Sequence, residues 1–106
     1  IHDPKPALSN YEQMLTDPNV DAVIVATSDQ FHVPAALQAV KAGKHVLVEK
    51  PLGVNIKEVS ELRDALRQTN LVLQVGNMKR FDPGIAFAKQ FIQNEMGEKL
   101  ALKAWY

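Results

Sequence analysis

Three short apolar runs that do not alternate with polar residues limit most strongly what this chain can fold into. The runs cover residues 22–26, 46–48 and 71–75, and they are rich in Val and Leu. Runs of this kind are typical of strands buried on both faces of a sheet. We therefore expect three such strands.

Two helical patterns lie between these runs. Apolar residues recur at helical spacing on one face of each segment, at Val33, Ala36, Leu37 and Val40 in the first and at Val59, Leu62 and Leu66 in the second. Because strand and helix alternate, the sequence predicts an α/β fold with a parallel sheet and flanking helices.

Capping residues mark the expected helix ends. Ser9, followed three residues later by Glu12, predicts the start of a first helix that buries Leu8, Tyr11 and Leu15 and ends at residues 17–19. Gly43 would close the second helix in a left-handed conformation, and Asn55 would cap the third. Asp82-Pro83 opens a fourth helix with an inner face of Ile85, Ala88 and Ile92, and Gly97 lies just past its end.

One domain boundary is expected, at the turn over residues 77–83. Apolar and polar residues alternate from residue 100 to residue 106, which is typical of the first strand of an antiparallel sheet covered on one side. We therefore expect residues 1–76 to belong to the parallel sheet and its helices. Residues 77–106 would begin a different, antiparallel sheet.

Composition narrows the classes of partner. The 106 residues contain 12 basic and 12 acidic side chains, a balance that does not favour nucleic acid or an anionic membrane surface. No apolar run approaches the roughly 20 residues that span a bilayer, and residues 1–6 do not resemble an export signal. The chain has no cysteine, which fits a reducing compartment, so we expect a cytoplasmic protein that acts on small molecules.

Polar and ionisable side chains gather after each expected strand, at residues 27–32, 49–51 and 76–80. Open parallel sheets bind ligands at the carboxyl ends of their strands, where loops and helix N-termini form a crevice. The strand beginnings carry a sparser polar set, which solubility alone would explain. The ligand site is therefore expected at the carboxyl ends.

Lys50 is the main catalytic candidate from its position alone. Neighbouring residues on an extended chain point to opposite sides, so either Glu49 or Lys50 can face the crevice, and Pro51 biases Lys50 toward an extended conformation. A lysine in a crevice can exchange protons with a substrate when its surroundings disfavour its charged form. The alternative is a solvated charge at a strand end.

His32 has two interpretations. It could hydrogen-bond a ribose or phosphate near the start of the second helix, or it could cap or pack that helix. The three histidines show no metal-ligand spacing, so no metal site is predicted. Lys79-Arg80 could hold an anionic or polyhydroxylated ligand, or could simply be solvated.

Three ordered segments, Val20 to Thr27, Ala42 to Pro51 and Gln74 to Pro83, together with His32, resemble the Gfo/Idh/MocA oxidoreductases, a family of sugar, inositol and related dehydrogenases. The similarity covers nearly the whole chain. It implies a partial Rossmann-like, dinucleotide-binding domain over residues 1–76, and a hinge and the beginning of a substrate and oligomerisation domain over residues 77–106. It implies a cofactor, NAD or NADP, and a secondary alcohol of a polyol or sugar-like substrate.

The resemblance also implies roles for individual residues. Lys50 matches the family's catalytic lysine, near both the nicotinamide and the substrate hydroxyl, and Glu49 lies toward the cofactor. Thr27, Ser28 and His32 would line the dinucleotide, although Ser28 departs from the proline common there. Asn77 would face the nicotinamide and Arg80 the substrate.

Two parts of the machinery that such a reaction uses are absent from these residues. The chain contains no Gly-x-Gly-x-x-Gly turn for a pyrophosphate, and it lacks the second-domain aspartate and histidine that the family places beside the lysine. We therefore expect the chain to be the central fragment of a longer enzyme, not active alone, from a parent that forms homo-oligomers. The alternatives are a non-catalytic dinucleotide- or sugar-binding regulatory protein of the same fold and a related two-domain reductase.

Overall fold

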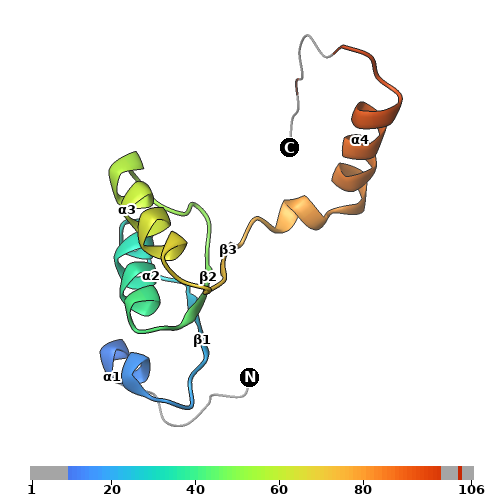
Figure 1. Cartoon of the computed structure of the whole chain (residues 1–106). Helices are drawn as coiled ribbons and strands as arrows, with labels where there is room; N and C mark the ends of the chain where they lie inside the picture. The colour runs from blue at the N-terminus through green and yellow to red at the C-terminus, as the bar shows by residue number, and fades with distance from the viewer. Residues whose placement is uncertain (1–9, 99–102, 104–106) are drawn as a thin grey trace. The chain divides into compact units, whose positions relative to one another are not determined.

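Figure 1 shows a computed structural model of the chain, which describes residues 10–98 and residue 103. Contacts within the chain divide it into two compact units, Ile1–Gly76 and Asn77–Tyr106.

A three-stranded parallel sheet forms the centre of the first unit. The strands are β1 (Ala22–Val25), β2 (His45–Val48) and β3 (Leu73–Val75), in the order β1-β2-β3. Both pairs are parallel, as the alternation of strand and helix patterns predicted. The bounds of the strands differ from those of the apolar runs by one or two residues. The prediction of a parallel sheet built from these runs is confirmed.

Helices cover one face of this sheet. The helices α2 (His32–Lys41) and α3 (Ile56–Arg67) pack against each other, and α2 also contacts β1 and β2; Figure 1 shows both on the same side of the strands. The prediction that the strands are buried on both faces is wrong for the described residues: Ile24 is 73% exposed and Leu47 is 40% exposed. Both belong to the face that no described helix covers, whereas their neighbours point toward α2.

The core lies between the sheet and its helices. It consists of small and branched apolar side chains, which allow close approach of a helix to a sheet. Its buried members are Leu15, Val23, Val25, Val33, Ala36, Ala39, Val40, Val46, Val48 and Leu62. The helical patterns therefore predicted the buried face of α2 correctly, and Leu62 in α3 is buried as predicted.

The first helix, α1 (Tyr11–Thr16), begins one residue later than a Ser9 cap would place it. Asn10 is the cap, because its side-chain oxygen accepts a hydrogen bond from the Glu12 amide at 2.8 Å. The prediction of Ser9 as the cap is wrong, and Ser9 itself lies outside the described residues. Leu15 is buried as predicted, but Tyr11 is 46% exposed and donates from its hydroxyl to Gln38 of α2.

The other predicted helix ends agree with the structure. Gly43 follows α2 with φ 76°, a left-handed conformation that favours glycine. Asn55 caps α3 by accepting from the Glu58 amide at 2.9 Å. Local capping chemistry therefore decides where these helices begin and end.

Lys44 and His45 connect the loops at the amino ends of the strands. Lys44 is 8% exposed, and its Nζ donates to the Asp17 carbonyl at 2.8 Å. The Nδ1 of His45 accepts from the Val72 amide at 2.9 Å. Solubility alone therefore does not explain the polar residues at this end. Hydrogen bonds from Asn19 lower the pKa of the Asp17 carboxyl.

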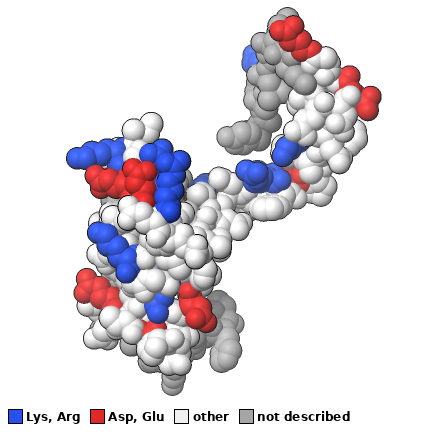
Figure 2. Space-filling view, in the orientation of Figure 1, with Lys and Arg blue, Asp and Glu red and all other residues white. Residues whose placement is uncertain are grey.

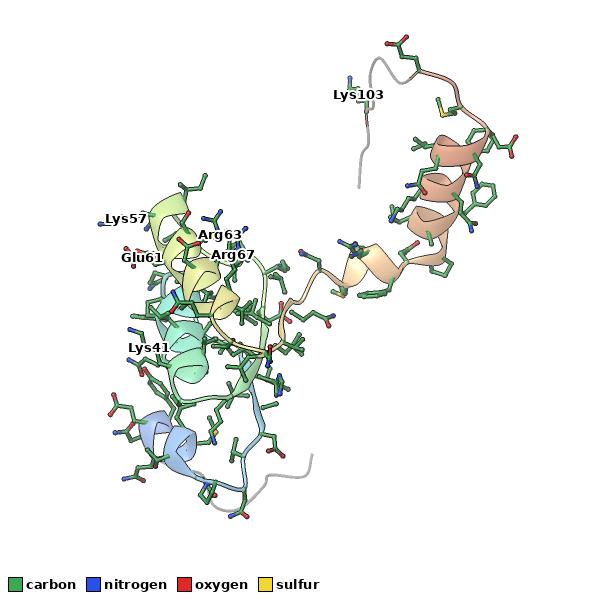
Figure 3. The ribbon with its side chains drawn as sticks, viewed as in Figure 1. Lys41, Lys57, Glu61, Arg63, Arg67 and Lys103 are labelled. Carbon is green, nitrogen blue, oxygen red and sulfur yellow. The ribbon has the colours of Figure 1, made fainter. Side chains whose placement is uncertain are left out.

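Charged side chains of both signs lie on the outer surface of α3. Figure 2 shows them mixed in this region, and in Figure 3 Lys57 and Glu61 extend from one side of the helix and Arg63 and Arg67 from another. Arg63 pairs with Asp64 at 3.0 Å, and both side chains are more than half exposed. This surface is a solvated helix face.

Within the described part of the chain, no helix is long and apolar enough to cross a membrane.

The second unit begins with the short 3-10 helix η2 (Met78–Phe81) and continues in α4 (Pro83–Asn94). Asp82 caps α4 by accepting from the Gly84 amide at 2.9 Å, with Pro83 at the first helical position as predicted. No described residue of α4 is buried, so the predicted inner face, Ile85, Ala88 and Ile92, is not packed on a core, and the helix ends at Asn94, before Gly97. The strand expected over residues 100–106 lies outside the described residues, apart from Lys103.

Candidate functional site

The carboxyl ends of the three strands lie at one edge of the sheet. Val25 pairs with Val48 and Val48 pairs with Val75 in the parallel register. The ladder continues one residue further, because the Glu49 amide donates to the Val25 carbonyl at 2.9 Å and the Gly76 amide donates to the Val48 carbonyl at 2.8 Å. The register therefore brings the loops after β1 and β2 and the end of β3 together.

The Glu49 carboxylate lies against Gly76. A side-chain Cβ built at residue 76 would lie 3.4 Å from the carboxylate carbon and from both its oxygens. Oε2 of the same carboxylate accepts from the Lys50 amide at 3.1 Å. Glu49 is exposed, so its charge stays available at the edge of the sheet.

Lys50 follows Glu49 in the turn after β2, and its side chain is exposed. The peptide bond between Lys50 and Pro51 is cis. Within the described residues, Lys50 forms no ion pair with Glu49, which agrees with neighbouring side chains pointing to opposite sides. Its amine therefore has no carboxylate partner in this part of the chain.

A glycine packs the turn that carries Lys50 onto the helices. A Cβ built at Gly53 would lie 2.6 Å from Cγ2 of Val33 in α2 and 2.9 Å from Cγ2 of Val59 in α3. No side chain fits at these distances, so residue 53 has to be glycine for this packing. This role of Gly53 cannot be recognised from the sequence, because Val33 belongs to an earlier helix and spacing does not indicate the contact.

Thr27 and Ser28 form the loop after β1, and both are exposed. The Ser28 carbonyl accepts from the Phe31 amide at 2.8 Å, which closes the loop into the 3-10 helix η1 (Asp29–Phe31). The hydroxyl of Thr27 donates to the Ser28 carbonyl at 3.3 Å. Both hydroxyls remain at the surface of the strand-end region.

His32 is placed differently from the other candidates, because its side chain is 1% exposed. Nδ1 lies 2.7 Å from the Pro51 carbonyl oxygen, and Nε2 lies 3.0 Å from the Thr27 carbonyl oxygen. The ring thus connects the loop after β1 with the turn after β2. Thr27, His32, Glu49 and Lys50 are therefore brought together in the first unit.

Asn77 and Arg80 belong to the second unit. The Asn77 carbonyl accepts from the Arg80 amide at 3.0 Å, which forms the turn of η2, and both side chains are exposed. Asn77 directly follows Gly76 in the sequence.

A cavity of about 260 Å³ lies beside β1, between residues of α1, β1 and α2. It is lined almost entirely by apolar side chains, including Met14, Ile24 and Pro34, and Thr27 forms part of its wall. Apolar walls do not supply partners for charged or hydroxylated ligands. The lining of this cavity therefore differs in chemistry from the polar strand ends. Among residues 10–98 and 103, no three His, Asp or Glu side chains gather to hold a metal ion.

Comparison with known proteins identifies the fold and the family. Residues 4–77 match the family model GFO_IDH_MocA, described as an oxidoreductase family with an NAD-binding Rossmann fold. The chain belongs to the Gfo/Idh/MocA oxidoreductase family. The three-stranded sheet and its helices are thus a portion of that NAD-binding fold.

Several members of the Gfo/Idh/MocA family are similar over most of this chain. It is 36% identical over 94 residues to scyllo-inositol 2-dehydrogenase (NAD(+)) of Bacillus subtilis, covering 88% of this chain and 28% of that protein. It is 36% identical over 99 residues to mouse trans-1,2-dihydrobenzene-1,2-diol dehydrogenase, covering 92% of this chain and 30% of that protein. The chain thus spans less than a third of the length of these relatives.

A solved Gfo/Idh/MocA structure is similar in three dimensions. It is scyllo-inositol dehydrogenase from Lactobacillus casei with bound cofactor NAD(H) and scyllo-inositol. The two are 34% identical with a TM-score of 0.73, and the match covers 79% of this chain and 25% of that one. The membership of the family that the sequence motifs indicated is therefore confirmed by comparison of sequences and by comparison of structures.

Proposed function

We propose that this chain is the central part of a longer nicotinamide-dependent dehydrogenase, which oxidises a secondary alcohol of an inositol, sugar or related polyol. The observation that carries the proposal is the placement of Lys50, an exposed lysine without a carboxylate partner among the described residues, at the shared carboxyl edge of a parallel sheet. Membership of an oxidoreductase family supports the reaction class. Two relatives, both scyllo-inositol dehydrogenases, support the substrate class.

In this mechanism Lys50 moves the hydroxyl proton. Oxidation of a secondary alcohol breaks the C–H bond, whose electron pair leaves with the hydrogen as hydride, and the O–H bond, whose proton passes to an acceptor. The Lys50 amine is that acceptor when it is unprotonated, and in the reverse direction it returns the proton to the carbonyl oxygen. A bound nicotinamide cofactor supplies the hydride acceptor.

The residues at the strand ends fit such a cofactor. Gly76 has no side chain, so the end of β3 stays open around the Glu49 carboxylate. Thr27 and Ser28 present exposed hydroxyls after β1, as donors and acceptors for a ribose or phosphate. We assign Thr27, Ser28 and Glu49 to cofactor binding. The names of two relatives specify NAD, which favours NAD over NADP.

The second unit is proposed to begin another domain. Residues 1–76 would be part of the dinucleotide-binding domain, and residues 77–106 the hinge and the start of a substrate and oligomerisation domain. The division of contacts between Gly76 and Asn77 supports this boundary. In that arrangement Asn77 faces the nicotinamide and Arg80 the substrate, and the parent assembles as a homo-oligomer.

Replacement of Lys50 with Met in the full-length protein that contains this chain tests the proposal. We expect kcat with NAD and inositols or related polyols to fall by about 10²- to 10⁴-fold, the usual contribution of a positioned acid or base. Cofactor affinity, measured by isothermal titration, should remain close to that of the unchanged protein.

Lys41→Met is the matched control, because Lys41 is an exposed lysine in the last turn of α2, which precedes the amino end of β2. This variant should keep full turnover. Near-normal kcat in Lys50→Met would refute the role of Lys50. Tight dinucleotide binding without turnover on any polyol, in the unchanged protein, would instead support a non-catalytic regulatory protein.

A further inference from the structure

His32 is a buried polar side chain that connects two loops of the proposed site. It is the first residue of α2, and its ring is 1% exposed. One acceptor, the Pro51 carbonyl, belongs to the residue directly after Lys50, and the other, the Thr27 carbonyl, lies in the loop after β1. Among the described residues, these are the side-chain hydrogen bonds that join the two loops.

Both partners of the ring are acceptors. A carbonyl oxygen has no proton to donate, so each contact is a hydrogen bond only if the ring nitrogen carries the proton. A neutral imidazole has one N–H, whereas the imidazolium has two. The distances of 2.7 and 3.0 Å are therefore both satisfied by the doubly protonated ring.

A ring with a single N–H would leave one nitrogen lone pair facing a carbonyl oxygen. The geometry of the two contacts therefore calls for a donor at each ring nitrogen.

We propose that His32 is a positioning residue, which holds the loop after β1 and the Lys50–Pro51 turn at a fixed separation by donating one hydrogen bond to each. The inference rests on the proposed dehydrogenase function, since His32 acts through Thr27 and Lys50. It replaces the direct cofactor contact implied by the family resemblance, because a ring buried to this extent and bonded at both nitrogens has no atom left for a ligand.

Two substitutions separate the two hydrogen bonds. In His32→Asn the side-chain amide nitrogen takes the place of Nδ1 and keeps the bond to Pro51. In His32→Gln the amide nitrogen takes the place of Nε2 and keeps the bond to Thr27. Each variant thus retains one donor and loses the other.

We expect the two variants to change different kinetic constants in the full-length protein. His32→Gln releases the turn that carries Lys50, so kcat should fall by about 10- to 100-fold, as expected when a catalytic group is misplaced by about 1 Å. His32→Asn releases the loop of Thr27, so KM for NAD should rise by about 2- to 12-fold, the net effect of one hydrogen bond, with kcat retained.

A residue that only packs the core would give no such division. Equal changes of kcat and KM in both variants, or a loss of thermal stability with unchanged kinetics, would overturn the proposal. If the variants do not fold, nitrogen-15 NMR of the histidine rings in the unchanged protein at neutral pH decides. Two protonated nitrogens in His32 support the two-bond connection, and one unprotonated nitrogen refutes it.

The failure of this inference is distinguishable from the failure of the proposed function. An enzyme that loses turnover in Lys50→Met but shows no division between His32→Asn and His32→Gln contradicts the positioning role alone. A protein that turns over normally in Lys50→Met contradicts the proposed function.

Discussion

Replacement of Gly53 with Ala tests the packing that holds the turn of Lys50 against the helices. The added Cβ would lie 2.6 Å from Cγ2 of Val33 and 2.9 Å from Cγ2 of Val59, well inside van der Waals contact. Val33 is 3% exposed, so its side chain has little room to move away. Insertion of a methyl group into a packed core costs about 1–3 kcal/mol. We expect the free energy of unfolding to fall by this amount.

Urea unfolding of the full-length protein, followed by circular dichroism, measures the effect. A loss of about 1–3 kcal/mol corresponds to about a 5- to 150-fold change in the unfolding equilibrium constant. Gly97→Ala is the control for the substitution itself, because a Cβ at Gly97 meets nothing within 4 Å. Gly43→Ala is the control for backbone strain, since Gly43 has open space but a φ of 76°.

A double-mutant cycle then identifies the clash. Val33→Ala removes the methyl group that the new Cβ meets, so Gly53→Ala should cost less in that background. The coupling energy should be about 0.5–3 kcal/mol, the range for residues in contact. If Gly53→Ala were as stable as Gly97→Ala, to within about 0.5 kcal/mol, the close approach of Gly53 to the helices would be refuted.

Two further predictions concern carboxylates. Gly76→Val should displace the Glu49 carboxylate, because a Cβ at residue 76 is already in contact with it at 3.4 Å and the two further methyl groups need additional space. KM for NAD should therefore rise; steady-state kinetics at saturating polyol measures it, and an unchanged KM would contradict the role of Glu49. The pKa of Asp17 is lowered in the folded state by hydrogen bonds from Asn19, so its ionised form stabilises the fold above the unfolded-state pKa, and this contribution is lost as the pH falls through the folded-state pKa. Urea unfolding of Asp17→Asn should therefore show lower stability than the unchanged protein at pH 7 and equal stability in acid; a pH-independent difference would argue against it.

The sequence predicts those parts of the fold that local chemistry determines. Asn55, Asp82 and Gly43 act within a few residues of themselves, through a capping bond or a backbone angle, so their roles can be recognised in the sequence. The three strands are also predicted from local sequence, because apolar runs that do not alternate with polar residues are typical of a parallel sheet. The placement of Ser9 as the cap failed because Asn10, the next residue, is an equally good cap.

Long-range contacts explain what the sequence did not predict. His32 reaches Pro51 across 19 residues, and Lys44 reaches Asp17 across 27. Neither pair is indicated by spacing. The sequence therefore left His32 open between a ligand contact and a capping or packing role, and it suggested solvation for Lys44. The open face around Ile24 was missed because a strand's composition does not show whether a covering helix belongs to the same chain.

The hydrogen bond between Lys44 and Asp17 stabilises the end of the sheet that is opposite to Lys50. It lies at the amino ends, where it joins the loop before β1 to the turn before β2, while Lys50 follows the carboxyl end of β2. An engineer who wished to raise or lower thermal tolerance could vary the Lys44 end and leave the proposed reacting groups in place. Specificity could be redesigned at exposed positions of the other end, provided that Gly53 and His32, which hold that end together, are kept.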